Sequence, residues 1–139
     1  MVIVVFNFTK IDAEKKDIPK GKININNNVA ITQVEEKKFF LGSEKQKVLG
    51  FTFEFMAKYN PDIGFIKFIG DVLYMADSKK VKEILDGWKK DKTLPKELMP
   101  SILNTVMNKC NIQALILSEQ INLPPPIRLP KLQMEQKQS

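Results

Sequence analysis

The chain has 139 residues, 43% of them hydrophobic and 27% charged, which suits one globular domain with its own core and excludes wholesale disorder. Its 22 lysines and arginines outnumber 16 acidic residues, so the net charge is +6. No residue is a histidine, which excludes a Ser-His-Asp triad, a Cys-His pair and imidazole metal ligands.

Four stretches in the first half have the composition or the alternation of β-strands. They are residues 2–11, 22–34, 48–58 and 65–76. The last two flank Asn60, Pro61 and Gly64, which are typical of a tight turn, so they form a predicted hairpin. Gly70 suggests a bulge or a bend in the return strand. The charged stretches 12–22 and 35–47 show no clear period and are expected to be connections.

The period then changes from two to that of a helix. Ser78 is the expected N-cap of a first helix that ends near the sequence KKDKT, and a second helix starts at about Pro100. The second helix carries one apolar stripe: Ile102, Leu103, Val106, Met107, Cys110, Ala114 and Leu117. Strands followed by helices indicate the α+β class, with a four-stranded antiparallel sheet, two helices and a proline-rich exit segment.

Little in the sequence suggests catalysis. The glycine motifs that bind phosphates are absent, and Cys110 lies on the apolar stripe, where it is expected to be a core residue. Glu54 and Asp71 lie in strands and could form a buried acid pair, but nothing around them supports this role. We therefore expect no enzyme, cofactor or metal. The single cysteine, the lack of a signal peptide and the lack of a long apolar run favour the cytoplasm without membrane insertion.

The chain carries more apolar residues than regular strands and helices require. Phe39, Phe40 and Leu41 follow a charged run, Met99 lies between two prolines, and the exit segment LSEQINLPPPIRLPKLQ mixes prolines with isoleucine and leucine. Two interpretations follow: these residues close the core or an oligomer interface, or they form a groove for extended apolar peptides.

The C-terminal half resembles the SecB family of protein-export chaperones. The resemblance rests on a helix-starting proline with a later cysteine, and on an apolar-Asn-Leu-x-Pro exit. Its residues are Pro100, Ile102, Leu103 and Cys110, then Ile121, Asn122, Leu123 and Pro125. The match covers roughly residues 100–127, and upstream only the strand order and the strand beginning GKININNNV fit.

This resemblance implies an ATP-independent holdase that binds non-native polypeptides or preproteins, assembled as a tetramer from two dimers. It implies one domain over residues 1–130 and a short polar tail over 131–139. The residues expected to bind unfolded polypeptide are Phe39, Phe40, Leu41, Met99, Ile121, Leu123, Ile127 and Leu129. The expected oligomer contacts are Ile102, Val106, Asn108 and Gln113.

Two alternatives remain open from the sequence. The bacterial members of the family are acidic, whereas this chain is basic, and lysine-rich loops with sheet aromatics also fit a nucleic-acid-binding module. The apolar surplus also fits an accessory subunit with one fixed protein partner. Clients, the downstream receiver and the exact oligomeric state do not follow from the sequence.

Overall fold

The computed structural model describes residues 2–19, 21–41 and 44–127, and among them the side chains of 5–19, 21–38 and 48–127. Four strands precede two helices, as predicted. They are β1 (Val2–Lys15), β2 (Asn24–Leu41), β3 (Glu44–Asn60), β4 (Gly64–Met75), α1 (Ser78–Asp91) and α2 (Leu98–Gln120). All neighbouring strands are antiparallel and lie in the order β1-β4-β3-β2, which confirms the α+β prediction.

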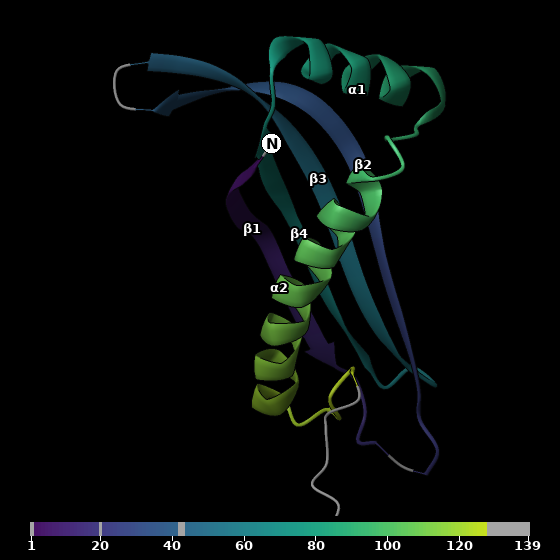
Figure 1. Ribbon diagram of the computed structural model, residues 1–139. Coiled ribbons are helices and arrows are strands. Elements are labelled where there is room, and N and C mark those ends of the chain that lie inside the picture. The colour runs from purple at the N-terminus through teal and green to yellow at the C-terminus, as the bar shows by residue number, and fades with distance from the viewer. Residues whose placement is uncertain (1, 20, 42–43, 128–139) are drawn as a thin grey trace, which may run out of the picture.

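The helices lie on one side of the sheet (Figure 1). Helix α2 runs along this face, and α1 crosses above its upper end. The outer ends of β2 and β3 reach past α1 as a long ribbon. Consequently the sheet has a covered inner face, an outer face without a helix, and two edge strands, β1 and β2.

Aromatic rings on the inner face form the centre of the core. Phe53 stacks on Phe6 at 5.1 Å between ring centroids, and Phe55 stacks on Phe68 at 5.5 Å. Helix α2 meets this layer with one buried side chain at every fourth position: Leu98, Ile102, Val106, Cys110, Ala114 and Ser118. These positions follow a single i±4 ridge, and the last three are small, so the helix can lie close to large rings.

Bulges in both edge strands keep the apolar side chains on the inner face. In β1 the pairing with β4 shifts between Phe8 and Lys10, beside Gly70, and in β2 the pairing with β3 shifts between Ile31 and Gln33. Each extra residue reverses the alternation, so Val34 is buried although it breaks the odd-numbered series that ends at Ile31. The irregularity expected at Gly70 is therefore present, but the extra residue belongs to the partner strand.

The strands are longer than the sequence analysis expected. β1 continues to Lys15. In the stretch that showed no period, residues 35–41 of β2 pair with β3, up to Leu41 opposite Glu44. Glu35 and Glu36 point to opposite faces of this ribbon and both are exposed. Glu35, Glu36 and Lys38 are charged and exposed, so no apolar alternation marks this part of β2.

Two other expectations concern chain boundaries. The N-cap of α1 is Asp77 and not Ser78, because the Asp77 carboxylate accepts a hydrogen bond from the Lys80 amide at 2.8 Å. The predicted domain end near residue 130 and the tail 131–139 lie outside the described residues.

Over the part of the chain described, no helix is both long and apolar enough to cross a membrane.

We expect Gly70→Ala to destabilise the fold by about 1–3 kcal/mol, because a Cβ there would collide with the Asn7 carbonyl oxygen and the Phe53 ring. Gly87→Ala is the matched control. Its Cβ would meet only the Thr93 carbonyl oxygen at 3.5 Å, and alanine in a helix should add about 0.5–1 kcal/mol of stability. Urea unfolding followed by circular dichroism measures both, and equal effects of the two variants would contradict the packing described here.

Candidate functional site

An apolar hollow lies between the edge strand β2 and the corner where α1 leads into α2. Its volume is about 470 Å³. It is lined by Val29, Ala30, Ile31 and Thr32 from β2, Trp88 and Lys92 from α1 and its cap, and Met99 and Leu103 from α2. We call this hollow the β2 groove. Among the described residues that line it, Lys92 alone is charged, and its ammonium lies 5.4 Å from the centre of the Trp88 ring.

The α1–α2 corner is held by backbone geometry. Lys92 adopts the left-handed conformation, with φ of 58°, and its N–H donates to the Trp88 carbonyl oxygen at 2.9 Å. Pro95 accepts from the amide of Leu98 at 3.0 Å, which starts α2. The corner thereby places Trp88 and Leu103 on one side of the same hollow.

The proline-rich exit segment is the second feature: one hydrogen bond ends α2 before it, and two others hold residues 124–126 against the lower end of the sheet. Asn122 is left-handed, and the Leu123 amide donates back to the Ser118 carbonyl oxygen at 2.8 Å, which ends α2 in a Schellman motif. The Tyr59 hydroxyl donates to the Pro124 carbonyl oxygen at 2.5 Å, and the Asn27 side-chain amide donates to the Pro126 carbonyl oxygen at 2.7 Å. Leu123 is buried at 5% exposure, so the extended segment belongs to the core.

Burial raises the pKa of Tyr59 to about 12. The hydroxyl therefore stays protonated, and able to donate to Pro124, at every physiological pH. Asn27 occupies an inner-face position between Ile25 and Val29, where the strand alternation otherwise calls for an apolar residue. A polar residue here interrupts the apolar alternation of the strand, and this interruption is the feature of the sequence that marks the hydrogen-bonding role of Asn27.

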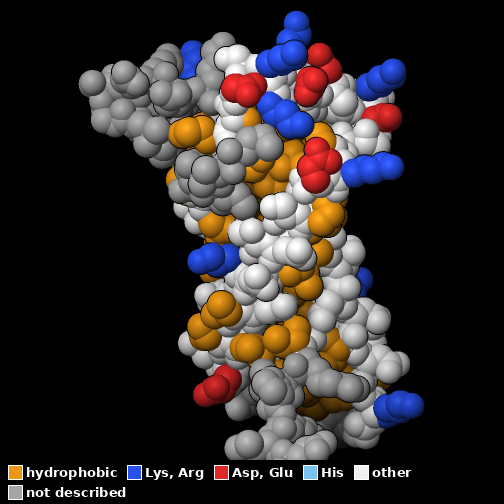
Figure 2. Space-filling view, viewed as in Figure 1, with side chains coloured by type: hydrophobic (Ala, Val, Ile, Leu, Met, Phe, Trp, Pro, Cys, Tyr) orange, Lys and Arg blue, Asp and Glu red, His pale blue; other side chains and the backbone are white. Residues whose placement is uncertain are grey.

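A second apolar surface lies on the side of α2 that faces away from the sheet. Ile112 is 60% exposed and Ile116 is 46% exposed, one helical turn apart. Figure 2 shows apolar side chains along α2 and in the space below α1, whereas the charged side chains gather on α1 and toward the ends of the molecule. Within the described residues these are the two large apolar side chains of the helix that remain mainly in solvent.

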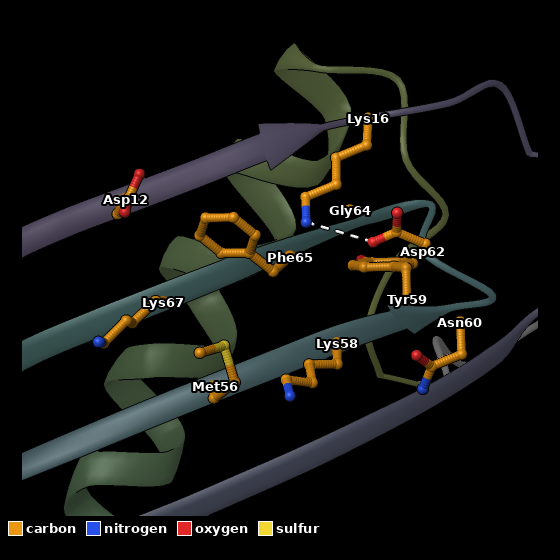
Figure 3. Close-up of a pocket in the computed structure, with 10 residues that line it drawn as sticks. All are labelled: Asp12, Lys16, Met56, Lys58, Tyr59, Asn60, Asp62, Gly64, Phe65 and Lys67. Atoms are coloured by element: carbon orange, nitrogen blue, oxygen red, sulfur yellow. Dashed lines mark hydrogen bonds and ion pairs between the residues drawn. The ribbon is translucent and has the colours of Figure 1, made fainter.

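The outer face of the sheet carries a hollow of a different kind, near the β3–β4 turn (Figure 3). Phe65 and Met56 form part of its floor, and the Lys16 ammonium pairs with the Asp62 carboxylate at 3.2 Å across its rim. Lys67 pairs with Glu54 at 3.3 Å on the same face. Lysines and carboxylates are thus interleaved here, and the face is neither strongly acidic nor strongly basic.

Comparison with protein families and with curated proteins finds no match for the sequence. Comparison with solved structures finds the Mycobacterium tuberculosis Rv1957 SecB-like chaperone in complex with a ChAD peptide from the Rv1956 HigA1 antitoxin. The TM-score is 0.52, with 13% identity, over 96% of this chain and 91% of that chain. The fold is SecB-like.

This SecB-like fold does not bring the predicted client-binding residues together. Met99 lines the β2 groove, but Ile121, Leu123 and Ile127 lie beyond the opposite end of the 23-residue helix α2, which is about 34 Å long. Phe39, Phe40 and Leu41 lie on the far ribbon of β2, where only their backbone is described, and Leu129 lies outside the described residues.

The predicted oligomer contacts divide between two sides of α2. Ile102 and Val106 have no exposed surface because they face the sheet, so they belong to the chain's own core. Asn108 is exposed and Gln113 is partly exposed. Ile112 and Ile116, which the sequence analysis did not select, are the more exposed apolar residues of this helix.

The residues considered for catalysis also have structural roles. Cys110 is fully buried, and burial raises its thiol pKa to about 12, as expected for an unreactive core residue. Glu54 and Asp71 do not form an acid pair, since each has a lysine partner: Lys67 for Glu54, and Lys37 for Asp71 at 3.7 Å. The described residues hold no group of three or more cysteine, aspartate or glutamate side chains suited to a metal ion.

We expect Tyr59→Phe to loosen the exit segment, because the Pro124 carbonyl oxygen loses its donor. The stability loss should be about 0.5–1.5 kcal/mol, with faster amide exchange at Leu123. An unfolded tyrosine ionises near pH 10 and Tyr59 only near 12, so the contribution of its hydroxyl is complete below pH 10 and declines as pH rises through this interval.

Unfolding measurements on both proteins from pH 7 to 12 test this prediction. The difference between wild type and Tyr59→Phe should be constant up to about pH 10 and should shrink above it. A difference that does not change over this range would contradict the assigned role of the hydroxyl.

Proposed function

We propose that this chain is a chaperone that holds non-native polypeptides in apolar grooves, without ATP or a cofactor. The observation that carries the proposal is the β2 groove, an apolar hollow beside a sheet edge in a SecB-like fold. The structural neighbour, described as a SecB-like chaperone in complex with an antitoxin peptide, supports a polypeptide as the ligand.

Physical considerations support this ligand class. Burying apolar surface yields about 25 cal/mol per Å² whatever the sequence that supplies it, so a groove lined by Trp88, Met99 and Leu103 can accept many different segments. The thioether of Met99 adapts to varied shapes at low cost. The α1–α2 corner that forms one wall of the groove is already held by backbone hydrogen bonds at Lys92 and Leu98, so little ordering of that wall is required when a client binds.

We further propose that α2 mediates self-association through Asn108, Ile112 and Ile116. These residues follow one another at intervals of four, which places them on one ridge of the helix. Association would remove the two exposed isoleucines from water, which is energetically favourable. Ile102 and Val106 are already buried within the chain and offer no such gain. A dimer of dimers is the assembly that the SecB resemblance implies, and export of preproteins is the corresponding cellular role.

The alternatives have less support. Phe51, Phe53 and Phe55 are fully buried in the core, so they offer no stacking platform for bases. An accessory subunit with one fixed partner would bind that partner at a defined ratio and would not bind unrelated unfolded chains.

The function is tested by diluting a chemically denatured protein into buffer and recording light scattering. Aggregation should be suppressed near stoichiometric ratios, without ATP, and equally at about 50 and 200 mM salt because apolar burial is not screened. Leu103→Asp should abolish suppression by placing a charge in the β2 groove. Ser101→Asp is the matched control, since it adds the same charge on the other side of the same helical turn, where the side chain is exposed.

Three outcomes contradict the proposal: no suppression by wild type, equal suppression by both variants, or an effect that disappears as salt rises. The last result would favour nucleic acid or another polyanion as the partner. Thermal unfolding of both variants ensures that a loss of suppression reflects the groove and not a loss of the fold.

Self-association is tested by sedimentation of a double variant, Ile112→Asp with Ile116→Asp. We expect it to shift wild-type oligomers to a smaller species with its fold intact, because both side chains are exposed within one chain. Ile18→Asp is the control, because Ile18 is 64% exposed in the loop before β2 and far from this ridge in the sequence. A monomeric wild type, or the same shift in both variants, would be evidence against this interface.

A further inference from the structure

The β2 strand has one side of its backbone open. β2 is the last strand of the sheet, and it pairs with β3 along its whole length. On its other side, no backbone hydrogen bond reaches residues 28–34 from any other described element. In an antiparallel strand, every second residue directs its N–H and C=O to the same side, so this stretch presents a row of unused donors and acceptors.

The open edge of β2 also forms one wall of the β2 groove. Four consecutive β2 residues, 29–32, line the groove together with Trp88, Met99 and Leu103. A chain that paired with this edge would become a fifth strand of the sheet. Its alternate side chains would face the α1–α2 corner, in line with Val29 and Ile31 on the inner face.

The exit segment limits this edge at its lower end. Asn27 donates its side-chain amide to the Pro126 carbonyl oxygen at 2.7 Å, so the chain at Pro126 lies directly beside the start of β2. Residues 124–126 are all proline and have no N–H, and therefore cannot act as the donors of an added strand themselves. The groove lies farther along β2, at residues 29–32, and stays available to another chain.

We propose that the β2 edge binds clients by strand addition: an extended segment pairs its backbone with residues 28–34 and inserts every second side chain into the β2 groove. This inference rests on the proposed function and specifies its ligand. The preferred client segment has apolar residues at alternating positions, as future β-strands do, and carries no positive charge near Lys92 at the groove wall. The other edge strand offers a less suitable setting, because Asp12 and Lys16 place charges in the hollow beside the end of β1.

Backbone-methylated peptides test strand addition while the protein remains wild type. The probe is a short neutral peptide with leucine or valine at odd positions and threonine at even positions. Two further versions carry N-methyl groups on the odd or on the even amides, which removes the donors along one edge only. Binding is followed through the fluorescence of Trp88, the one tryptophan of the chain, which lines the groove.

We expect one methylated version to bind at least about tenfold more weakly than the parent peptide, and the other to bind within about threefold of it. If both bind like the parent, strand addition is wrong and clients are held by side-chain burial alone, with the proposed function intact. If both are weakened equally, one-sided pairing is also wrong. If the parent peptide does not bind, the proposed function fails together with this inference.

Amide exchange measured by NMR identifies the edge. The parent peptide should slow exchange at every second amide between residues 28 and 34, and should leave the β1 amides between 5 and 12 unchanged. Protection of β1 in place of β2 would overturn the assignment. Leu103→Asp should remove both the fluorescence response and the protection, whereas Ser101→Asp should retain them.

Discussion

The packing of α2 against the aromatic face of the sheet is the interaction on which the rest of the structure depends. One ridge of the helix, from Leu98 to Ser118, packs against the sheet and is buried. Since an α-helix has further sides, those that carry Leu103 and Ile112 remain available for other contacts. The buried ridge thus decides which apolar residues support the fold and which can meet a partner.

The same packing determines where the two ends of the helix lie. At its start, the α1–α2 corner brings Trp88 next to β2 and creates the β2 groove. At its end, the Schellman motif turns the chain back onto the sheet, where Tyr59 and Asn27 hold the prolines. Residues 123–126 are therefore fixed against the core, and their position leaves the middle of the β2 edge open.

Exposure of apolar groups and of a sheet edge usually carries a risk of aggregation. Two features of this chain reduce the risk. A bulge lies in β2 at the groove, and bulges twist an edge away from regular pairing. Charged side chains cover α1 and both faces of the ribbon around Glu35 and Glu36, and the net charge of +6 opposes self-contact. An open sheet edge and exposed apolar groups thus coexist with features that oppose aggregation.

By itself, the sequence determined the order of the strands and helices, the Asn60–Gly64 turn and the identity of most core residues, because apolar periodicity is a local property that burial imposes on each element. It did not show the ribbon over 35–41 and 44–47, because the β2 residues at its start are charged and exposed and carry no apolar alternation. Nor did it show which side of α2 packs on the sheet, because Ile102 and Ile112 are equally apolar. Only the tertiary structure decided which strand is an edge and which apolar residues stay open. These properties depend on which segments become neighbours in space, and no local pattern records that. For the same reason the groove combines Met99, which the sequence suggested, with Trp88, Leu103 and the middle of β2, which it did not suggest.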